Sequence, residues 1–402
     1  MRIAVRVMIA EGCACMVPGG VMKFSLVQSE LYRSLQLVAG VVPTKTAAQH
    51  LTSILVEATE NGELRFTGTD LDAFLVTSLH ASVEQPGIAA IPARRLLEVV
   101  RELPGDVVEI SSTASGISIH CGNGRFRIVG PDPQEFPPLP ELNEEKIFAV
   151  SSSVLARLVA QTAYAASTDY TRPEQTAVFV HVVGGDLRFV ATNGHRLAMA
   201  FHAADYPAWA DVLVPTKTLA VLQRLLSEAQ ESVSISANKR YCLFNLGSTR
   251  LYTRLLDGPF PPYQQAIPSG CDSHADLDRE VLAAALRRVT VFSESATRMV
   301  KVTIDSGRLG LAAEAHDVGE ASEAVSADYE GPQFRTGFNG GYLLDLLKTM
   351  TTDRVRISFK ESGAASIFEP TPLEGKPDLL CLVMPLRLQD EPARGGETVA
   401  AN

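Results

Sequence analysis

The sequence predicts an α+β fold built from three repeated modules, each with the order β-α-β-β-β-β-α-β-β-β. One pattern occurs three times: a short strand enters a helix, and a turn and another strand follow. Pro92, in the first copy, and Pro215, in the second, are 123 residues apart, and Pro215 and Asn339 are 124 apart. A fixed period is the signature of repeated structural units. The chain therefore contains three copies of one module of about 120 residues.

Other landmarks keep the same spacing. The strand and helix that begin at Phe24 return at Phe148, and more loosely from Ala275. The proline-rich exits of the first two modules carry Phe136 and Phe260, which are again 124 residues apart. Several landmarks in one frame argue against unrelated domains that happen to share similar helices.

Within the first module, period-two alternation predicts strands, and apolar positions three or four apart predict helices. We expect a strand at 24–27, then a helix from an N-cap at Ser29 to about Gly40. Asn61-Gly62 is typical of a hairpin turn, and Pro92 should start the second helix. The remaining strands are expected at 51–58, 63–69, 73–80, 107–111, 116–121 and 125–129.

The repeat also divides the chain. We expect modules at 22–143, 144–270 and 271–388, with proline-rich exits between them. Residues 1–21 match no repeat and are expected to be a disordered extension or to follow an upstream start codon. The polar residues 389–402 are expected to form a disordered tail.

Composition limits the class of protein. The chain has 46% hydrophobic and 20% charged residues, which is ordinary for a globular protein. No apolar run reaches the ~18 residues of a membrane span. The six cysteines show no CxxC or His/Cys zinc spacing, so we expect no metal, no cofactor and a reduced cytoplasmic location.

Catalytic motifs are missing from the sequence. It contains no GxxxxGK[ST], GxGxxG or GxSxG pattern. The only clusters that suggest chemistry are Asn193 with His195, and Glu314 with His316 and Asp317, at equivalent places in two repeats. Catalysis needs groups that converge from separate elements, so these clusters are better interpreted as strand and turn residues.

Basic residues concentrate on the predicted helices. The six helical windows contain eleven Lys and Arg against eight Asp and Glu, whereas the whole chain carries a net charge of −10. If all six helices faced one duplex, many weak phosphate contacts would add up. A solvated helix face would have the same composition, so this pattern does not decide the function.

Two short segments predict a site for a partner protein. ATNGHRLAMA, from Ala191, places His195 and Arg196 beside a tight turn at the end of a strand. The last strand, from Leu379, stays apolar beyond Pro385, which a buried core strand would not require. Two apolar segments near one module boundary favour a groove for a partner peptide.

These segments also resemble a known family. MKFSL at Met22, ATNGHRLA at Ala191, DGPFPPY at Asp257, GFNGGYLLDLL at Gly337 and LVMPLRL at Leu382 resemble the bacterial sliding clamp, the DNA polymerase III beta subunit. The resemblance implies the DNA clamp fold in a ring-forming, head-to-tail homodimer around duplex DNA. It implies a non-catalytic processivity factor with four kinds of partner: DNA polymerases, repair proteins, an ATP-driven clamp loader and DNA bound without sequence specificity.

The resemblance also implies site residues. Its peptide groove, between the second and third modules, would use Thr192, Gly194, His195, Arg196, Leu197, Pro261, Ala266, Val383, Met384, Pro385 and Leu386. Gln175 and Gln265 stand where the family often has leucine and arginine, so partner preference should differ. We expect Met384 to act as a gate because its unbranched chain changes rotamer easily, and Arg196 to position a peptide carbonyl.

Further positions follow from the same register. DNA contacts would involve Lys45, Arg172 and Lys217, although Pro173 and Glu174 replace tyrosines common in the family. The dimer interface would join a basic segment of one chain to an apolar and acidic surface of the other: Arg125, Phe126 and Arg127 against Val291, Phe292, Glu320 and Glu323.

Two other classes of function stay open. The chain could be an enzyme that uses the surroundings of His195 or His316, which a measured turnover would support. It could also be a three-module scaffold that binds proteins without encircling DNA. A loading assay on circular DNA separates the scaffold from the clamp.

Overall fold

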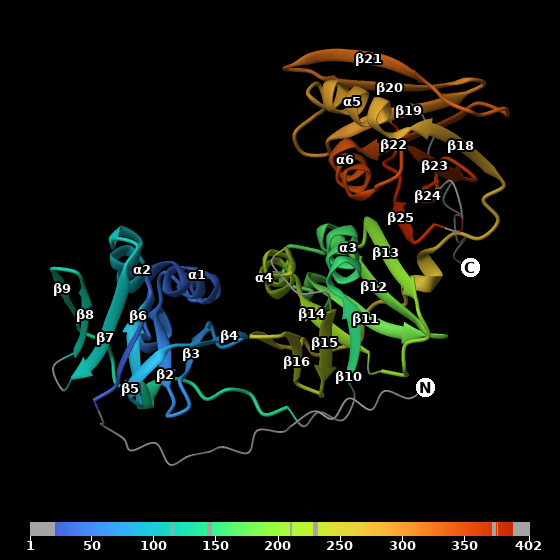
Figure 1. Cartoon of the computed structure of the whole chain (residues 1–402). Coiled ribbons are helices and arrows are strands. Elements are labelled where there is room, and N and C mark those ends of the chain that lie inside the picture. Colours follow the sequence, from blue (N-terminus) through green and yellow to red (C-terminus); the bar gives the residue numbers. More distant parts are fainter. Residues whose placement is uncertain are drawn as a thin grey trace, which may run out of the picture. The chain divides into compact units, whose positions relative to one another are not determined.

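The structure is a computed structural model that describes residues 21–113, 116–142, 147–209, 211–227, 232–371, 375 and 377–388. It forms two compact units, Met1–Glu141 with Leu243–Tyr252, and Leu142–Cys242 with Thr253–Asn402 (Figure 1). The extension predicted for 1–21 (Val21 excepted), the tail predicted for 389–402 and the module boundary at 143/144 lie outside the described residues.

Two α-helices and antiparallel strands build the described part of the first unit. One sheet has the order β5-β1-β7-β8-β9, and β17, β4, β3, β2 and β6 follow one another in a second sheet. The bounds are β1 Lys23–Val27, α1 Gln28–Ala39, β2 Ser53–Ala58, β3 Glu63–Thr69, β4 Ala73–His80, β5 Ser82–Gln85, β6 Gly87–Pro92, α2 Ala93–Glu102, β7 Val107–Thr113, β8 Gly116–Cys121, β9 Gly124–Ile128 and β17 Thr249–Arg254.

The core of this unit follows the predicted periodicity. Leu31, Leu35 and Val38 form one buried stripe of α1, and Leu96 and Val100 form that of α2. These side chains join inward-facing residues of both sheets in one buried cluster. Side chains four apart on a helix and two apart on a strand share a face, so both patterns in the sequence point at one core.

Among its described residues, the second unit contains four α-helices and two sheets of its own. Its eight-stranded sheet has the order β14-β11-β12-β13-β25-β24-β23-β18, its four-stranded sheet has the order β21-β20-β19-β22, and β10 pairs with β15. The strands before the third module are β10 Ile147–Ser151, β11 Ala177–Val183, β12 Asp186–Thr192, β13 Arg196–Ala203, β14 Val212–Pro215, β15 Ser232–Ala237 and β16 Tyr241–Leu246. The later strands are β18 Ser273–Asp278, β19 Met299–Asp305, β20 Arg308–Ala315, β21 Gly319–Ser326, β22 Phe334–Asn339, β23 Arg354–Phe359, β24 Ser366–Pro370 and β25 Leu379–Val383.

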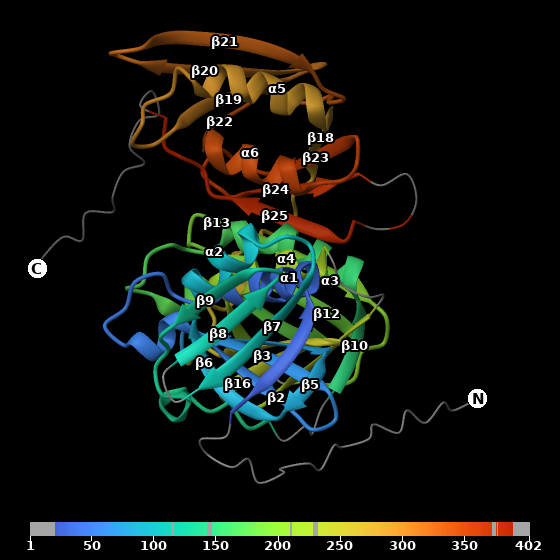
Figure 2. The same ribbon diagram turned by 60° about the vertical axis from the view of Figure 1, so that its left-hand side comes forward.

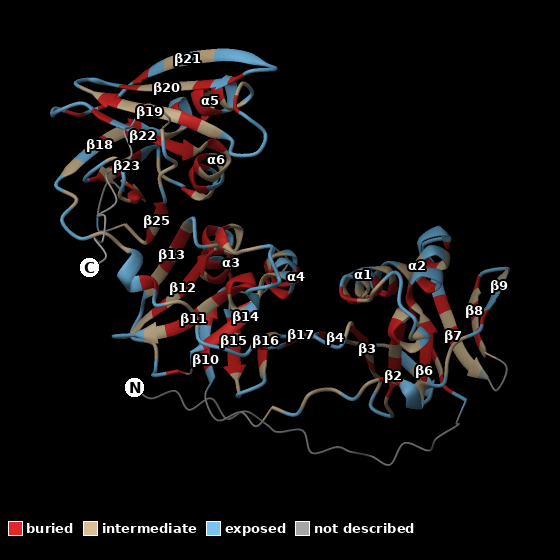
Figure 3. Cartoon of the chain, turned by 180° about the vertical axis from the view of Figure 1, so that it is seen from behind, coloured by how far each residue is buried: buried red, intermediate tan, exposed pale blue. Residues whose placement is uncertain are grey.

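The helices of the second unit pack in pairs. Helix α3 contacts α4, and α5 contacts α6. Their bounds are α3 Ser152–Thr162, α4 Thr216–Leu226, α5 Arg279–Thr290 and α6 Gly340–Thr349. Each buries one stripe and leaves its other face accessible (Figure 3). The element order of the second and third modules is the predicted one, which confirms the α+β fold of three repeated modules.

Two local predictions for the first module are wrong. Helix α1 begins at Gln28, and its N-cap is Val27, which makes no side-chain cap bond, so Ser29 lies inside the helix. The Gln28 N–H instead donates to Asp106 O at 3.0 Å. A strand, Ser82–Gln85, was also missed, and it pairs with β1 at the edge of the five-stranded sheet.

No helix in the described part of the chain is both long and apolar enough to cross a membrane.

Candidate partner-binding and assembly surfaces

Strands β13 and β25 join the second and third modules in one sheet (Figures 1 and 2). They pair antiparallel, with Arg196 opposite Val383 and Leu197 opposite Leu382. Just beyond the last ladder pair, Met384 N–H donates to His195 O at 2.8 Å. The structure therefore brings together the two segments that the sequence predicted as groove walls, although they are nearly 190 residues apart.

A tight turn presents His195 at the start of β13. Asn193 Oδ1 accepts the N–H groups of His195 and Arg196, each at 3.0 Å. Thr192 Oγ1 donates to Arg196 O at 2.7 Å and accepts from the Gly194 N–H at 3.1 Å. Gly194 has φ +85°, a conformation that residues with a Cβ rarely adopt. The TNGHR sequence thus encodes a rigid turn and leaves the His195 side chain exposed.

After β25 ends at Val383, the chain runs alongside Gly337 of the third module. Leu386 N–H donates to Gly337 O at 2.8 Å, and the two residues form an isolated antiparallel bridge. A Cβ on Gly337 would lie 2.9 Å from Leu386 O, so glycine is needed for this close approach. Between these fixed points, Met384 stays 42% exposed. The segment Val383–Leu386 is therefore anchored at both ends while the Met384 side chain reaches solvent.

An apolar cluster lies against this joint. Leu197 and Leu382, opposite each other on β13 and β25, are buried in it with Val190, Tyr263 and Ala365. Partly buried apolar side chains surround them: Phe179, Met199, Phe260, Ile267 and Leu380. Partly buried aromatic groups at a module joint are typical of a surface that a partner covers.

The segment Phe260–Ala266 borders the same cluster. It carries the predicted groove residues Pro261 and Ala266 and contains a short 3-10 helix, Tyr263–Ala266. Tyr263 is buried, and the Phe260 ring stacks on Phe179 with centroids 5.0 Å apart. The two aromatic residues thus place Pro261 and Ala266 beside the cluster that contains Leu197.

Arg196 makes contacts that the sequence did not reveal. Its guanidinium lies 4.4 Å from the centre of the Tyr342 ring and 5.2 Å from that of Tyr164. Nη1 lies 2.6 Å from Asp345 Oδ2, and Nη2 donates to Tyr164 O. The side chain is only 12% exposed. Arg196 therefore binds helix α6 of the third module to the second module, which leaves its two terminal nitrogens already engaged.

A neighbouring contact reinforces the joint. Tyr164 Oη lies 3.2 Å from Cys381 Sγ on β25. Burial raises the pKa of the Tyr164 hydroxyl well above its ordinary value and raises the pKa of the Cys381 thiol to about 12. Both groups are therefore neutral near pH 7, and the contact is an uncharged hydrogen bond.

The Gln175 side chain also reaches this region. It is buried, and its Oε1 lies 4.0 Å from the position that a Cβ on Gly194 would take. A polar amide thus stands next to the Gly194 turn. Gln265, by contrast, is exposed on the 3-10 helix of the bordering segment.

The predicted DNA contacts lie on exposed positions. Lys45 follows α1 in the first unit, Arg172 precedes the short 3-10 helix Pro173–Thr176, and Lys217 is in the first turn of α4. The Arg172 loop is held by Asp169, whose carboxylate accepts the N–H and the hydroxyl of Thr171 at 2.9 and 2.8 Å. The hydrogen bond from the Thr171 N–H, together with that from the Thr171 hydroxyl, lowers the pKa of Asp169.

Five of the seven predicted interface residues lie on the terminal strands of two sheets. Arg125, Phe126 and Arg127 are exposed on β9, the last strand of the five-stranded sheet. Glu320 and Glu323 are on β21, the end strand of the four-stranded sheet, which is largely exposed (Figure 3).

Two apolar residues lie near the acidic strand. Val291 is 67% exposed just after α5, and the Phe292 ring comes within 3.9 Å of a Cβ built on Gly319 at the start of β21. Glu323 accepts a hydrogen bond from Arg288 Nε at 3.0 Å, so one of the two acidic residues is already paired within the chain.

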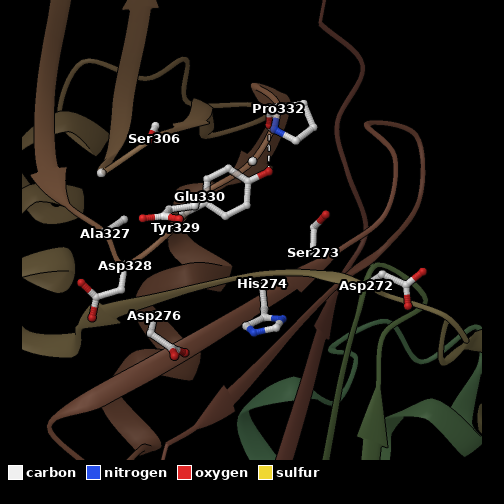
Figure 4. A pocket seen from close by; sticks show the side chains of 12 residues that line it. Asp272, Ser273, His274, Asp276, Ser306, Ala327, Asp328, Tyr329, Glu330 and Pro332 are labelled. Atoms are coloured by element: carbon white, nitrogen blue, oxygen red, sulfur yellow. Dashed lines mark hydrogen bonds between the residues drawn. The ribbon is translucent and has the colours of Figure 1, made fainter.

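A cavity of about 620 Å³ lies elsewhere in the third module (Figure 4). Its acidic side chains are partly paired: Asp276 lies 2.7 Å from Arg356, and Asp328 contacts Arg354. The Arg356 hydrogen bond lowers the pKa of Asp276. Within the described ranges, no group of three or more His, Cys, Asp or Glu could hold a metal ion. Glu314, His316 and Asp317 are exposed around a strand turn.

Comparisons with known proteins match almost the whole chain to one family. Family models of the DNA polymerase III beta subunit match three stretches: the N-terminal domain at 22–140, the central domain at 149–262 and the C-terminal domain at 264–387. A Caulobacter vibrioides protein named beta sliding clamp is 33% identical over 378 residues, covering 91% of this chain and all of the relative. One from Pseudomonas aeruginosa is 32% identical over 371 residues, with coverage of 91% and 100%.

Solved structures are similar over the same length. A sliding clamp, DNA polymerase III subunit beta, from Pseudomonas aeruginosa bound to griselimycin has a TM-score of 0.86 at 32% identity and covers 92% of this chain and 100% of its own. A DNA polymerase sliding clamp from Caulobacter crescentus has a TM-score of 0.86 at 32% identity, with coverage of 91% and 100%.

Proposed function

Because this chain belongs to the DNA polymerase III beta subunit family, the non-catalytic beta sliding clamps of DNA replication, we propose that it works as a closed, head-to-tail homodimer around duplex DNA. We also propose that it holds DNA polymerases, repair proteins and the clamp loader through short peptides. The predicted groove, formed by Thr192–Leu197, Phe260–Ala266 and Val383–Leu386, would be their common site. We further propose a cytoplasmic location, because bacterial DNA is replicated there.

The pairing of β13 with β25 is the observation that supports the groove most strongly. It holds the His195 turn and the exposed Met384 side by side and sets a partly buried apolar cluster next to them. A peptide with a leucine and a phenylalanine could bury two side chains there, at ~1.5–3 kcal/mol each. Ordering the peptide offsets part of this gain, so we expect affinity near 1 μM, about −8 kcal/mol.

The charges of strands β9 and β21, and their positions at the ends of their sheets, support the proposed ring-shaped homodimer. Strand β9 carries Arg125 and Arg127, and β21 carries Glu320 and Glu323, at the ends of their sheets. End strands offer backbone groups to another chain. Opposite charges favour pairing of unlike strands over self-pairing, and unlike ends that meet head to tail can close a ring. Phe126, 40% exposed, and Phe292 would supply apolar anchors.

A peptide titration tests the groove. A labelled Gln-x-x-Leu-Phe peptide is titrated into the wild type, into Met384→Glu and into Val281→Glu, a control at another exposed apolar residue on α5. Met384→Glu should weaken binding by about tenfold or more, because it puts a charge beside the apolar cluster. The control should bind like the wild type. Equal affinity of all three proteins would place the partner site elsewhere.

A further inference from the structure

His181 is a buried histidine beneath the segment that borders the predicted groove. It lies on β11 and is 4% exposed. Its ring stacks on Phe179 with centroids 4.4 Å apart and meets the Tyr263 ring edge-on at 5.8 Å. Its Nε2 lies 3.2 Å from Tyr263 Oη. A histidine in such a place must be neutral or find a counter-charge, because burial penalises the imidazolium.

Two routes of contact connect His181 to the groove residues. Tyr263 begins the 3-10 helix that ends at Ala266, and its ring is buried with Leu197. Phe179, which stacks on His181, also stacks on Phe260, the residue before Pro261. Phe260, at the start of Phe260–Ala266, and Tyr263, within it, therefore rest on the His181–Phe179 pair. A change at His181 can reach Pro261 and Ala266 although it does not touch a peptide.

We propose that His181 is a positioning residue for the predicted groove: its neutral ring accepts the Tyr263 hydroxyl and holds Phe260–Ala266 in its peptide-binding position, and protonation releases this segment. The inference rests on the proposed function of the groove. When Nδ1 carries the proton, Nε2 has a free lone pair and Tyr263 O–H donates to it. In the imidazolium form both nitrogens carry hydrogens, so Nε2 can only donate and the Tyr263 hydroxyl must turn its own proton away. The ring then also carries a buried positive charge on the side of Arg188, which disfavours the packed arrangement.

The charged groups around the ring define its titration. Arg188 lies opposite His181 on β12, Asp211 precedes β14 on the other side, and the Tyr263 hydroxyl is the third titratable neighbour. Burial, assisted by Arg188, lowers the pKa of His181 below its ordinary 6.5, while Asp211 opposes this shift. The neutral form is therefore the resident form at pH 7. Protonation sets in as the pH falls below 6.5, towards the lowered pKa.

Peptide affinity as a function of pH tests the role of His181. The same labelled peptide is titrated between about pH 8 and about pH 5, a range that spans histidine protonation. The proteins are the full-length wild type, His181→Gln and His195→Gln. Glutamine at 181 keeps a side-chain acceptor near the position of Nε2 but does not titrate. His195→Gln is the control for the exposed imidazole in the groove itself.

The wild type should lose affinity by about fivefold to tenfold at the acidic end, the usual size of one hydrogen bond. His181→Gln should keep most of the wild-type affinity at pH 8 and lose markedly less on acidification. His195→Gln should lose more affinity on acidification than His181→Gln does, as the wild type does. An equal acid loss in His181→Gln and the wild type would overturn the proposal.

Imidazole NMR of the wild type provides an independent measurement. The His181 ring signals should titrate below pH 6.5, and the Tyr263 and Ala266 signals should shift with the same midpoint. Absence of this shared midpoint would overturn the proposal even if His181→Gln failed to fold. If the wild type bound no peptide at pH 8, the proposed function would fail instead, and the NMR titration would still decide whether His181 controls the segment.

Discussion

Arg196 of the second module and Asp345 of the third form an ion pair, with Nη1 2.6 Å from Oδ2. The two residues are 149 positions apart, and the guanidinium also lies over the rings of Tyr342 and Tyr164. Stacking on aromatic faces and pairing with a carboxylate suit the planar guanidinium better than they suit a lysine. Arg196, which we expected to meet a peptide carbonyl, thus uses its two terminal nitrogens at the joint between modules.

This contact predicts the effect of Arg196→Met. The variant leaves Asp345 without its partner and removes both cation–π contacts, but Asp345 is half-exposed, so the loss is smaller than for a fully buried pair. We expect the free energy of unfolding of the second unit to fall by about 1–3 kcal/mol. Arg308→Met breaks an exposed pair with Asp305 and should change it by less than ~0.5 kcal/mol. Denaturant titration of both variants measures the difference, and equal effects would contradict this role.

The Gly194 turn predicts a backbone effect. Gly194→Ala forces a Cβ into φ +85° and should cost about 1–2 kcal/mol in the free energy of unfolding. At Gly363 a Cβ would meet no atom within 4 Å, and its φ lies outside the positive range. Gly363→Ala is therefore the matched control and should be neutral or slightly stabilising. A Gly194→Ala protein as stable as that control would show that the turn tolerates a Cβ.

The proposed interface predicts the state of assembly. Phe292→Asp places a carboxylate near the acidic strand β21 and should give monomers at low micromolar concentration, because burying an unpaired charge is costly. Val281→Asp, at another half-exposed apolar position, should stay dimeric. Sedimentation of both variants measures the difference. A dimeric Phe292→Asp protein would rule out this interface.

The proposed DNA contacts predict a dependence on salt. Lys45, Arg172 and Lys217 would each neutralise one phosphate, so replacing all three by alanine should flatten the plot of log affinity against log salt by up to ~3 units, at about 0.9 per contact. Replacing Lys239, Arg335 and Lys360, which are exposed and lie outside the residues that we assign to the interface, the groove and the DNA contacts, should leave the slope unchanged. An unchanged slope in the first variant, or sequence-specific binding by the wild type, would contradict the proposed contacts.

Local patterns in the sequence predicted much of the fold. The period-two runs predicted β3 and β4 to the residue, and the repeat predicted the element order of the later modules. The predicted cap at Ser29 was wrong because Asp106, far along the chain, satisfies the first N–H of the helix. A local rule cannot anticipate a partner that only the folded sheet brings near.

The same distinction holds for the site. The turn at Asn193-Gly194 is encoded by adjacent residues, so the sequence revealed it. The partners of Arg196 on α6 and the contact between His181 and Tyr263 join residues 82 to 149 positions apart. Such contacts leave no period in the sequence, and nothing in a buried strand distinguishes His181 from a core residue until its neighbours are known.

Retention on circular DNA tests the central claim most directly. The protein is loaded onto nicked circular DNA by an ATP-driven clamp loader, separated from free protein at high salt, and then the DNA is cut once. A closed ring should stay on the circle, because topology rather than contact energy holds it, and should leave after cutting. Equal retention on circular and cut DNA, or loss from both, would contradict a ring that encircles the duplex and would favour a scaffold that does not.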